Sequence, residues 1–463
     1  MKIDTYPPPL EEIISSVLGI SSRTVTDDLA YRDIAEWDSL AHVRLMLKIK
    51  STYDVEITNE LVSSLTTVGS IRAFLDGGAA PEGGSRKPSG DGDGTTASTK
   101  VHRGLAGINF DRTAITNVDA AGNTLRYRGY SVDELATRSN FEETAYLLMR
   151  GHLPRADEMG EFSRKLRASR PIPAPAAEVL RALAGAPPFL ALQAAVAALG
   201  AARSQDADPD MTAVAQLPTL VGALHRLRSG EAPVEPDPGL GHAANLLAMI
   251  RGVPPDPEEA ATLEEALVIL ADHGSSASTF TARVAVSTNA GMHAALASAI
   301  GAFSGALHGG AVDQVIAMAE EIGTPSAAAR FVQRRLERKD VVYGFGHRVY
   351  RTADPRSRRL RFLAQKLSAN GGDKRILDVL EAIPPALREH ASVGLDVNVD
   401  FYASAVFEAL RLPRDLFGPV FFAARTAGLV AHCREQRANN VLIRPQLLYQ
   451  GAAARAYEER APA

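Results

Sequence analysis

The first part of the chain spaces its apolar residues at intervals of three and four, which is typical of amphipathic helices. The pattern predicts a helix over residues 8–18, a second helix with Ser39 at its N-cap or in its first turn, and a short last helix over residues 67–75. An acidic loop separates the first two. The apolar residues that carry these predictions are Leu10, Ile13, Ile14, Val17, Leu18, Val43, Met46, Leu47, Val68, Ile71 and Phe74.

Residues 78–100 interrupt this pattern with glycines, serines and charged residues and with almost no large apolar side chain. Such a composition cannot contribute to a packed core. A flexible tether of this kind has a root-mean-square span of roughly 25–30 Å. The sequence therefore predicts a first domain over residues 1–77, a flexible linker over 78–100, and a second region over 101–463.

The second region opens with short alternating segments and continues with long helical patterns. The stretch from Arg103 to Tyr130 predicts short strands or turns, and a helix should begin near Ser131. Proline clusters separate the later patterns. The chain is therefore expected to be mainly α-helical, with further helices over residues 141–149, 176–183, 240–250, 263–271 and 294–303.

Length, charge and cysteine content narrow the class of protein. A chain of 463 residues is too long for one ordinary core, so two or more domains are expected. A net charge of -4 argues against general nucleic-acid binding. The single cysteine, Cys433, excludes an internal disulfide and fits a cytoplasmic protein. The start lacks a signal peptide, and no uninterrupted apolar run is long enough to span a bilayer, so no membrane partner is expected.

Three segments carry groups that can move or hold a proton. Gly344 and Gly346 permit a tight loop that presents His347, and arginines follow on the same segment, which suits an anion site. His308 is set against two glycines, and Asp400 lies inside an apolar run. Each could instead be structural, as a turn, a cap or an ion-pair partner. No phosphate-binding loop, dinucleotide fingerprint or zinc spacing is present, so no metal is expected.

Residues 1–77 resemble acyl carrier proteins. The family's mark is Asp-Ser-Leu at the start of the second helix, and Asp38-Ser39-Leu40 matches it. The resemblance implies a four-helix domain whose Ser39 carries 4′-phosphopantetheine, attached by a phosphopantetheinyl transferase. A phosphodiester there would face the free N–H groups of a helix start, although serine at such a position is more often a plain N-cap. The domain's twelve acidic and seven basic residues fit carriers that dock on basic patches.

Residues 101–463 resemble the citrate synthase family over essentially their whole length. The resemblance implies an all-helical fold with a large domain and a small domain, the small one at roughly 313–418, and a homodimer. The matching motifs, in family order, are Tyr127-Arg128-Gly129-Tyr130, Asp272-His273-Gly274, Ala277-Ser278-Thr279-Phe280, Leu307-His308-Gly309-Gly310-Ala311, Gly344-Phe345-Gly346-His347-Arg348-Val349-Tyr350, Asp354-Pro355-Arg356, Asn398-Val399-Asp400-Phe401-Tyr402, Arg425, Ala431-His432, Glu435-Gln436-Arg437 and Ile443-Arg444-Pro445.

Condensation of an acyl thioester with a 2-oxo acid needs a base for the α-proton, a donor at the thioester oxygen and a donor at the ketone. One carboxylate and two histidines meet this need without a metal. The resemblance implies that Asp400 is the base, that His308 stabilises the enol and that His347 polarises the ketone.

The resemblance also implies the groups that bind the two substrates. A dicarboxylate needs fixed cations in fork geometry. Arg356, Arg425 and Arg444 match the family's arginines for this role, with Arg444 reaching the neighbouring subunit's site. His273 matches a further contact to the oxo acid, and Arg351 matches a position that binds coenzyme A phosphate.

Several positions depart from the family pattern while the catalytic residues are retained, which favours altered substrate choice over lost catalysis. A proline before the Leu-His pair, an Asn-Glu pair after the glycines, an asparagine before Ala-Ser-Thr, a Tyr-Pro pair before Asn-Val-Asp and a tryptophan before Ala-His are all absent. The residues found at these places are Ala306, Val312-Asp313, Ser276, Asp396-Val397 and Leu429-Val430.

Three functions remain open from the sequence. The first is a citrate synthase-like acyltransferase that condenses a thioester held on Ser39 with oxaloacetate or a related 2-oxo acid. The second is an ordinary citrate or 2-methylcitrate synthase that uses acyl-coenzyme A, with the carrier domain only docking partners. The third is a non-catalytic scaffold for a carrier domain. The retained histidines and aspartate argue against the third, and Arg351 keeps the second open.

Overall fold

The structure is a computed structural model in which the chain divides into two compact units, residues 1–100 and 101–463. We call them the N-terminal unit and the C-terminal unit and describe each by itself. The predicted linker lies outside the described residues. The structure describes residues 7–31, 33–34, 36–37, 39–57, 61, 65–76, 103–105, 108–201, 208–338, 340–347, 349–350, 352–370, 374–390, 396–452 and 454.

The N-terminal unit is helical, as predicted. α1 ends where Gly19 adopts a left-handed conformation with φ 69°, and Thr67 caps α4 by accepting a hydrogen bond from the Ser70 amide. Buried apolar side chains from α1, α2 and α4, with Trp37, form one core. The fourth helix of the prediction stays a prediction. The described elements are α1 (Leu10–Leu18), η1 (Ser22–Thr24), α2 (Ser39–Tyr53) and α4 (Val68–Leu75).

The C-terminal unit begins with the predicted short strands. β1 (Thr116–Asp119), β2 (Thr124–Tyr127) and β3 (Tyr130–Ser131) form an antiparallel sheet in the order β1-β2-β3. Thr116 pairs with Tyr127 in the β1–β2 register, and the buried Tyr127 points its hydroxyl into the helical body, where it contacts the Asp272 carbonyl oxygen at 2.9 Å. The sheet is therefore a small attachment to a helical unit.

Helices make up the rest of the C-terminal unit, and five of the predicted patterns are helical. α12 begins six residues before its predicted start at 263, because Asp256 caps it by accepting hydrogen bonds from the Glu258 and Glu259 amides. The elements before the candidate site are η2 (Arg103–Leu105), α5 (Val132–Arg138), α6 (Phe141–Arg150), α7 (Ala156–Ala168), α8 (Ala174–Ala182), α9 (Pro188–Leu199), α10 (Pro209–Arg228), α11 (His242–Arg251) and α12 (Pro257–Leu270).

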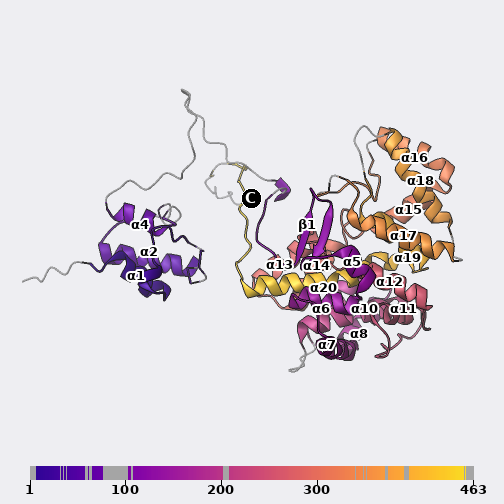
Figure 1. Ribbon diagram of the computed structural model, residues 1–463, viewed down its shortest axis with the longest axis horizontal. Coiled ribbons are helices and arrows are strands. Elements are labelled where there is room, and N and C mark those ends of the chain that lie inside the picture. The colour runs from indigo at the N-terminus through magenta and orange to yellow at the C-terminus, as the bar shows by residue number, and fades with distance from the viewer. Residues whose placement is uncertain are drawn as a thin grey trace, which may run out of the picture. The chain divides into compact units, whose positions relative to one another are not determined.

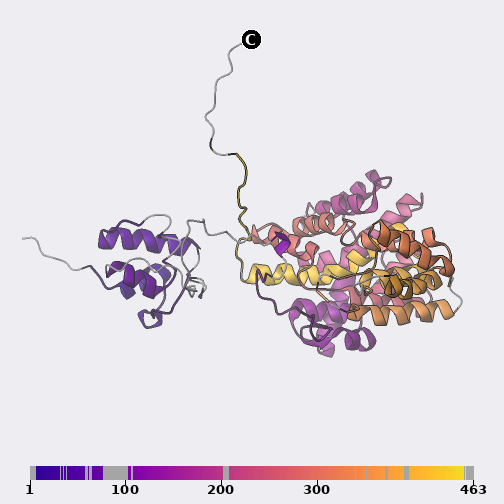
Figure 2. The ribbon, with the colours of Figure 1, turned by 90° about the horizontal axis from the view of Figure 1, so that it is seen from above.

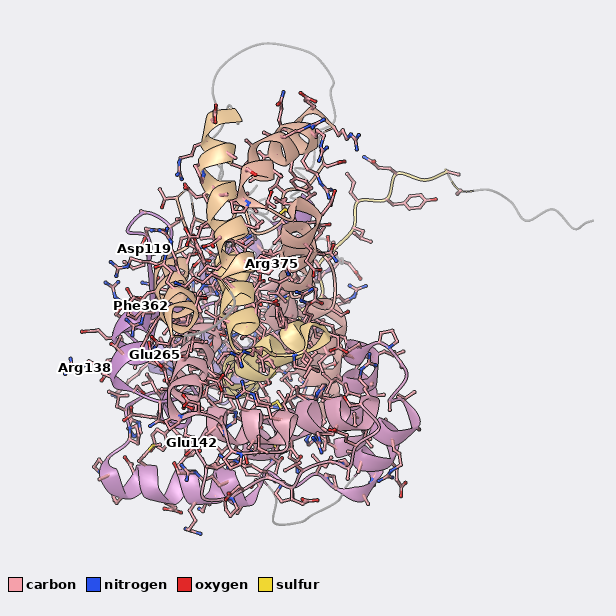
Figure 3. The ribbon with its side chains drawn as sticks, turned by 90° about the vertical axis from the view of Figure 1, so that its right-hand side faces the viewer. Asp119, Arg138, Glu142, Glu265, Phe362 and Arg375 are labelled. Atoms are coloured by element: carbon pink, nitrogen blue, oxygen red, sulfur yellow. The ribbon has the colours of Figure 1, made fainter. Side chains whose placement is uncertain are left out.

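The elements that follow along the chain and surround the candidate site are α13 (Ala277–Ser287), α14 (Met292–Phe303), α15 (Ala311–Ile322), η3 (Pro325–Ala327), α16 (Ala328–Glu337), α17 (Pro355–Ala369), α18 (Arg375–His390), α19 (Val399–Ala409), η4 (Arg414–Leu416) and α20 (Phe417–Ala438). Figure 1 shows α15 to α19, coloured orange, gathered at one side of the unit, and α17 packs on α19 and α16 on α18. Figure 3 shows these helices with side chains, with Phe362 on α17 and Arg375 at the start of α18 labelled. The predicted small-domain boundary at 313–418 stays a prediction.

α20 is the central helix of the C-terminal unit. It packs against α6, α10, α12, α13 and α14, and Figure 1 shows it, in yellow, running through the middle of these helices. The helical stretch Arg414–Ala438 is long and apolar enough, by length and composition, to cross a membrane, but its apolar window is entirely buried within the unit. Burial of this kind is typical of a core helix. α20 therefore positions whatever polar side chains it carries, including Arg425 and His432.

Candidate active site

The loop between α16 and α17 makes the tight turn that the sequence predicted. Gly344 and Gly346 have φ angles of 82° and 80°, in the left-handed region that favours glycine. A Cβ on Gly344 would lie 2.6 Å from Cδ2 of Phe401, so a larger residue would force Phe401 or the loop itself to shift. His347 follows directly, with its side chain 17% exposed. The loop thus holds His347 against the body of the unit.

The backbone fixes which nitrogen of His347 carries the proton. Nδ1 accepts hydrogen bonds from the amides of Val349 at 2.9 Å and Tyr350 at 3.1 Å. A neutral imidazole has one donor and one acceptor nitrogen, so the proton is on Nε2. Burial, opposed by the charge of Asp354, lowers the pKa of His347, which keeps the ring neutral near pH 7. His347 therefore offers an Nε2–H donor.

Arg356 is buried at the start of α17 and is held by a neighbouring carboxylate. Its Nε and Nη2 donate to the two oxygens of Asp354, at 3.0 and 2.7 Å. The residue is only 3% exposed, yet Nη1 is buried and has no hydrogen-bond partner among the described residues. A buried unsatisfied donor is costly, by about 1–3 kcal/mol. Nη1 is therefore positioned to donate a hydrogen bond to an anionic ligand.

Asp400 is the second residue of α19, and its environment favours the protonated form. Asn398 caps the helix, with its side-chain oxygen accepting from the Asp400 amide at 3.1 Å. Burial raises the pKa of Asp400 to about 7, against the opposing charge of Arg356. A carboxyl group with a pKa near the working pH can both take and return a proton.

His308 lies between α14 and α15 and has the opposite tautomer from His347. Ser278 on α13 donates its backbone N–H to Nε2 at 3.3 Å, and its hydroxyl lies 2.9 Å from the same nitrogen. The proton is consequently on Nδ1. Burial lowers the pKa of His308 to about 4, and the charge of Arg425 adds to the shift, so the ring is neutral near pH 7. His308 therefore offers an Nδ1–H donor.

Arg425 and His273 complete the group of predicted residues that the fold brings together. Arg425, on α20, is 2% exposed and donates from Nε to the Leu270 carbonyl at 2.8 Å. Burial, and then the charge of Arg356, holds the pKa of His273 well below its usual value. The His273 ring lies 5.2 Å from that of His347, and its Nε2 lies 3.3 Å from the Tyr350 hydroxyl. The charges of Arg356 and Arg425 both act on Asp400.

Three of these groups also lie close enough to hold a metal ion. One ligand atom each from His273, His347 and Asp354 lies within 4.8 Å of the others. Their existing contacts favour another use. His347 carries its proton on Nε2, the nitrogen that lies 3.8 Å from Asp354, and both oxygens of Asp354 accept from Arg356. The contacts favour a hydrogen-bonding site over a metal site.

The remaining predicted residues lie elsewhere or outside the described residues. Ser39 is the first residue of the 15-residue helix α2, at the helix start that the sequence predicted. Arg444 is exposed in the extended segment after α20, which Figure 2 shows leaving the helical body. Arg351 lies outside the described residues. Within one chain, no contact among the described residues therefore joins Arg444 to the buried Arg356 or Arg425.

Sequence reasoning gave no role to the residues that hold the site together. Asp354 stands two positions before Arg356 in a quoted motif, and that spacing was the available signal. Tyr350 also stood in a quoted motif, but nothing in it pointed to a contact with His273. Ser278 lies 30 residues from the histidine that it orients, so no local pattern could have paired them.

Comparisons with known proteins divide the chain in the same way. The family model "Citrate synthase, C-terminal domain" matches residues 104–446, and the model "Phosphopantetheine attachment site" matches residues 9–75. A citrate synthase of Synechocystis is 38% identical over 359 residues, covering 75% of this chain and 90% of its own. A 2-methylcitrate synthase of Mycobacterium tuberculosis is 37% identical over 364 residues, covering 76% and 91%.

Solved structures agree with the fold. Citrate synthase from Pyrobaculum aerophilum matches with a TM-score of 0.73 and 32% identity, covering 81% of this chain and 99% of its own. Citrate synthase from Thermoplasma acidophilum, solved as a ternary complex with carboxymethyl coenzyme A and oxaloacetate, matches with a TM-score of 0.74 and 28% identity, covering 78% and 98%.

Proposed function

Because the chain belongs to the citrate synthase family, we propose that it condenses an acyl thioester with oxaloacetate or a related 2-oxo acid through an enol intermediate. One observation carries the proposal. His308 and His347 are neutral, and backbone N–H groups occupy one nitrogen of each ring, so the proton is on the other nitrogen. Among the described residues, that protonated nitrogen makes no hydrogen bond in either ring. The charges of Arg356 and Arg425, which act on His347 and His308 respectively, both act on a carboxyl group, Asp400, whose pKa burial raises to about 7.

In this proposal each of the three groups serves one bond change. Asp400 takes the α-proton of the thioester, and the electron pair of that C–H bond forms the enol. His308 donates from Nδ1–H to the thioester oxygen as the enol develops. The enol carbon then attacks the ketone carbon of the oxo acid, the electron pair of the C=O bond moves to the oxygen, and His347 Nε2–H stabilises that oxygen by a hydrogen bond. The proton that Asp400 took balances the proton of the resulting hydroxyl, so His347 keeps its own. Neutral donors suit this role because each stabilises negative charge on an oxygen by a hydrogen bond and keeps its own charge unchanged.

Two buried arginines would bind the carboxylates of the oxo acid. Nη1 of Arg356, which has no hydrogen-bond partner among the described residues, and the guanidinium of Arg425 supply the positive charge, and Asp354 keeps the Arg356 guanidinium in a fixed plane. Burial lowers the pKa of Arg425, and repulsion from the charge of Arg356 lowers it further. A bound dianion would relieve this repulsion. We propose that His273 is a further contact to the same substrate.

The extended segment after α20 supports a homodimer in which Arg444 completes the partner's site. The described part of this segment exposes a run of large apolar side chains, and such side chains are usually covered in an assembled protein. We propose that a second copy of the chain covers them. The exposed residues are Val441, Leu442, Leu447, Leu448 and Tyr449.

The N-terminal unit suggests where the thioester is held. Its match to a phosphopantetheine attachment site, with Ser39 at the first position of α2, supports 4′-phosphopantetheine on Ser39, added by a phosphopantetheinyl transferase. A tethered thioester would act at a local concentration on the order of millimolar. We propose that acyl groups on this arm are the donors for condensation.

A second candidate is an ordinary citrate or 2-methylcitrate synthase that uses acyl-coenzyme A. It is favoured by the relatives of those names, which cover 75% and 76% of this chain and at least 90% of their own length. In that case Arg351 would contact a coenzyme A phosphate, and the N-terminal unit would only dock partners.

The test compares three forms of the full chain: apo protein, holo protein acylated on the arm, and Ser39→Ala. Product formation from oxaloacetate is followed by mass spectrometry, with acyl-coenzyme A at micromolar and at saturating concentration. The carrier-linked proposal expects the acylated holo form to be fastest at low donor concentration. Equal rates for all three forms would leave the coenzyme A-dependent synthase. No product from any form with acetyl or propionyl donors would leave the scaffold.

A further inference from the structure

One face of α20 makes polar contacts with three successive residues of the turn that leads to His273. Arg425 donates from Nε to the Leu270 carbonyl at 2.8 Å, and the Gly428 amide donates to the Ala271 carbonyl at 3.2 Å. One turn further along the helix, Nε2 of His432 lies 3.3 Å from Oδ2 of Asp272. Spacings of three and four residues put these groups on one side of the helix. The face therefore follows the backbone that leads into His273.

Close approach of the two segments depends on a glycine. A Cβ on Gly428 would overlap the Ala271 carbonyl oxygen and the Asp272 carboxylate. With no side chain there, α20 lies directly against the turn, and His432 can reach Asp272. Both residues are buried, with exposures of 1% and 0%. Each of these deeply buried polar groups therefore supplies one of the hydrogen-bond partners that the other needs.

The proton on His432 is fixed by a second buried group. Arg283 on α13 donates from Nη1 to Nδ1 of His432, with 3.2 Å between the nitrogens, and arginine has no acceptor. Nδ1 must therefore accept, and Nε2 carries the proton that points to Asp272. Arg283 is itself held by Asp111, Glu435 and Gln436.

Asp272 passes this constraint to the turn on either side of His273. Its Oδ2 also accepts the Gly274 amide at 2.8 Å, and Gly274 has φ 57°. Its backbone is held by Tyr127, whose hydroxyl contacts the Asp272 carbonyl at 2.9 Å and accepts the Asp272 amide at 3.1 Å. Burial would raise the pKa of Asp272, but His432 and Arg425 outweigh it and hold the pKa below its usual value. The carboxylate therefore stays ionised and keeps both hydrogen bonds.

We infer that His432 is a positioning residue for oxo acid binding: through Asp272 and the Gly274 amide it fixes the turn that presents His273 to the substrate. It touches no reacting atom. The inference rests on the proposed function, because it takes His273 to be an oxo acid contact. It adds that the affinity for the oxo acid depends on a buried chain from Arg283 through His432 to Asp272.

The first experiment separates positioning from general stability. His432→Leu removes both hydrogen bonds, whereas His432→Gln can still accept from Arg283 and donate to Asp272. We expect KM for oxaloacetate to rise about 10- to 100-fold in His432→Leu, as for a lost hydrogen bond to a charged group, with KM for acetyl-coenzyme A within about threefold of wild type. His432→Gln should restore KM to within about threefold.

A matched control is available in the same unit. His242 on α11 is also buried, and neither of its ring nitrogens has a hydrogen-bond partner among the described residues. His242→Leu should leave KM for oxaloacetate unchanged, whatever it does to the melting temperature. Similar increases in KM for both substrates in His432→Leu, together with a matching change in His242→Leu, would mean a loosened fold and would overturn the inference.

The second experiment asks whether His432 acts through His273. In a double-mutant cycle with His273→Ala, His432→Leu should add no more than about twofold to the KM of the single His273→Ala variant, since residues that act through one contact are not additive. Full additivity would overturn the inference. Oxaloacetate binding by calorimetry gives the same comparison without turnover. A wild-type protein that neither binds nor condenses oxaloacetate would instead refute the proposed function.

Discussion

Two groups of residues in the candidate site are held in different ways. The local group, His347, Arg356 and Asp400, is fixed by partners two or three positions away in the sequence. The long-range group, His273, His308 and Arg425, is fixed across intervals that reach 155 residues for Arg425 and Leu270.

The difference has a consequence for how the site responds to change. The partners of a local residue move with its own segment. A shift of the loop around His347 or of the start of α17 would therefore preserve the tautomer of His347 and the pairing of Arg356 with Asp354. A long-range support exists only while the two segments that carry its residues stay packed, as α20 and the end of α12 must for Arg425 and Leu270. The long-range group should therefore respond to substitutions in the core, whereas the local group should respond mainly to substitutions within its own motifs.

The largest effect should come from the local group. Asp400→Asn keeps the size of the side chain and loses the base, and removing a general base costs about 10²- to 10⁴-fold. We expect kcat to fall about 1,000-fold, with solvent exchange of the thioester α-proton falling in parallel. Exchange is measured by mass spectrometry in deuterated water. Undiminished exchange in a folded variant would move the base to another residue.

A smaller effect, on binding, should come from Arg356→Lys. Lysine keeps the charge but cannot pair with both oxygens of Asp354 and still present the donor that Nη1 supplies. KM for oxaloacetate should rise about 30- to 100-fold, which corresponds to about 2–3 kcal/mol of lost binding, with KM for the thioester nearly unchanged. Arg359→Lys, on the same helix and paired with Glu265, is the matched control.

The pH profile tests the electrostatics of Asp400 itself. Its pKa is raised from the usual range to about 7, so the base form increases through that pH, and kcat/KM should rise about tenfold from pH 6 to pH 8. Between the unfolded pKa, near 4, and the folded pKa the native state binds the extra proton, so this group lowers stability as pH rises. Asp400→Asn should therefore melt higher than wild type at pH 8, and the two should converge near pH 4. A wild-type profile flat from pH 6 to 8 would contradict the assignment.

The smallest effect should come from Ser278→Ala in the long-range group. The variant removes the hydroxyl at 2.9 Å from His308 Nε2, but the backbone N–H at 3.3 Å still fixes the tautomer. We expect kcat to fall only about three- to tenfold, the cost of one neutral hydrogen bond. Ser298→Ala, on α14, is the matched control. A loss as large as that of Asp400→Asn would mean that the long-range group depends on the hydroxyl far more than its contacts indicate.

The sequence alone specified the elements and the local geometry. Apolar spacing predicted α1, α2 and α4 in the N-terminal unit and α5, α6, α8, α11, α12 and α14 in the C-terminal unit. Gly344 with Gly346 predicted the turn before His347, because tolerance of a positive φ is a property of glycine itself. The Asp354–Arg356 and Asn398–Asp400 contacts each join residues two positions apart, so the quoted motifs already contain both partners. Carrier and synthase resemblances identified the two units, while the roles of the site residues stay predictions.

The tertiary structure decided which distant groups meet. No pattern along the chain relates Ser278 to His308, or His432 to Asp272, since these contacts exist only where helices pack. Gly428 illustrates the reason: its missing side chain lets α20 lie against the turn of His273, and the meaning of that glycine depends on what it faces. Hydrogen bonds need atoms within about 3.5 Å, and over long sequence separations only the packed core supplies that precision.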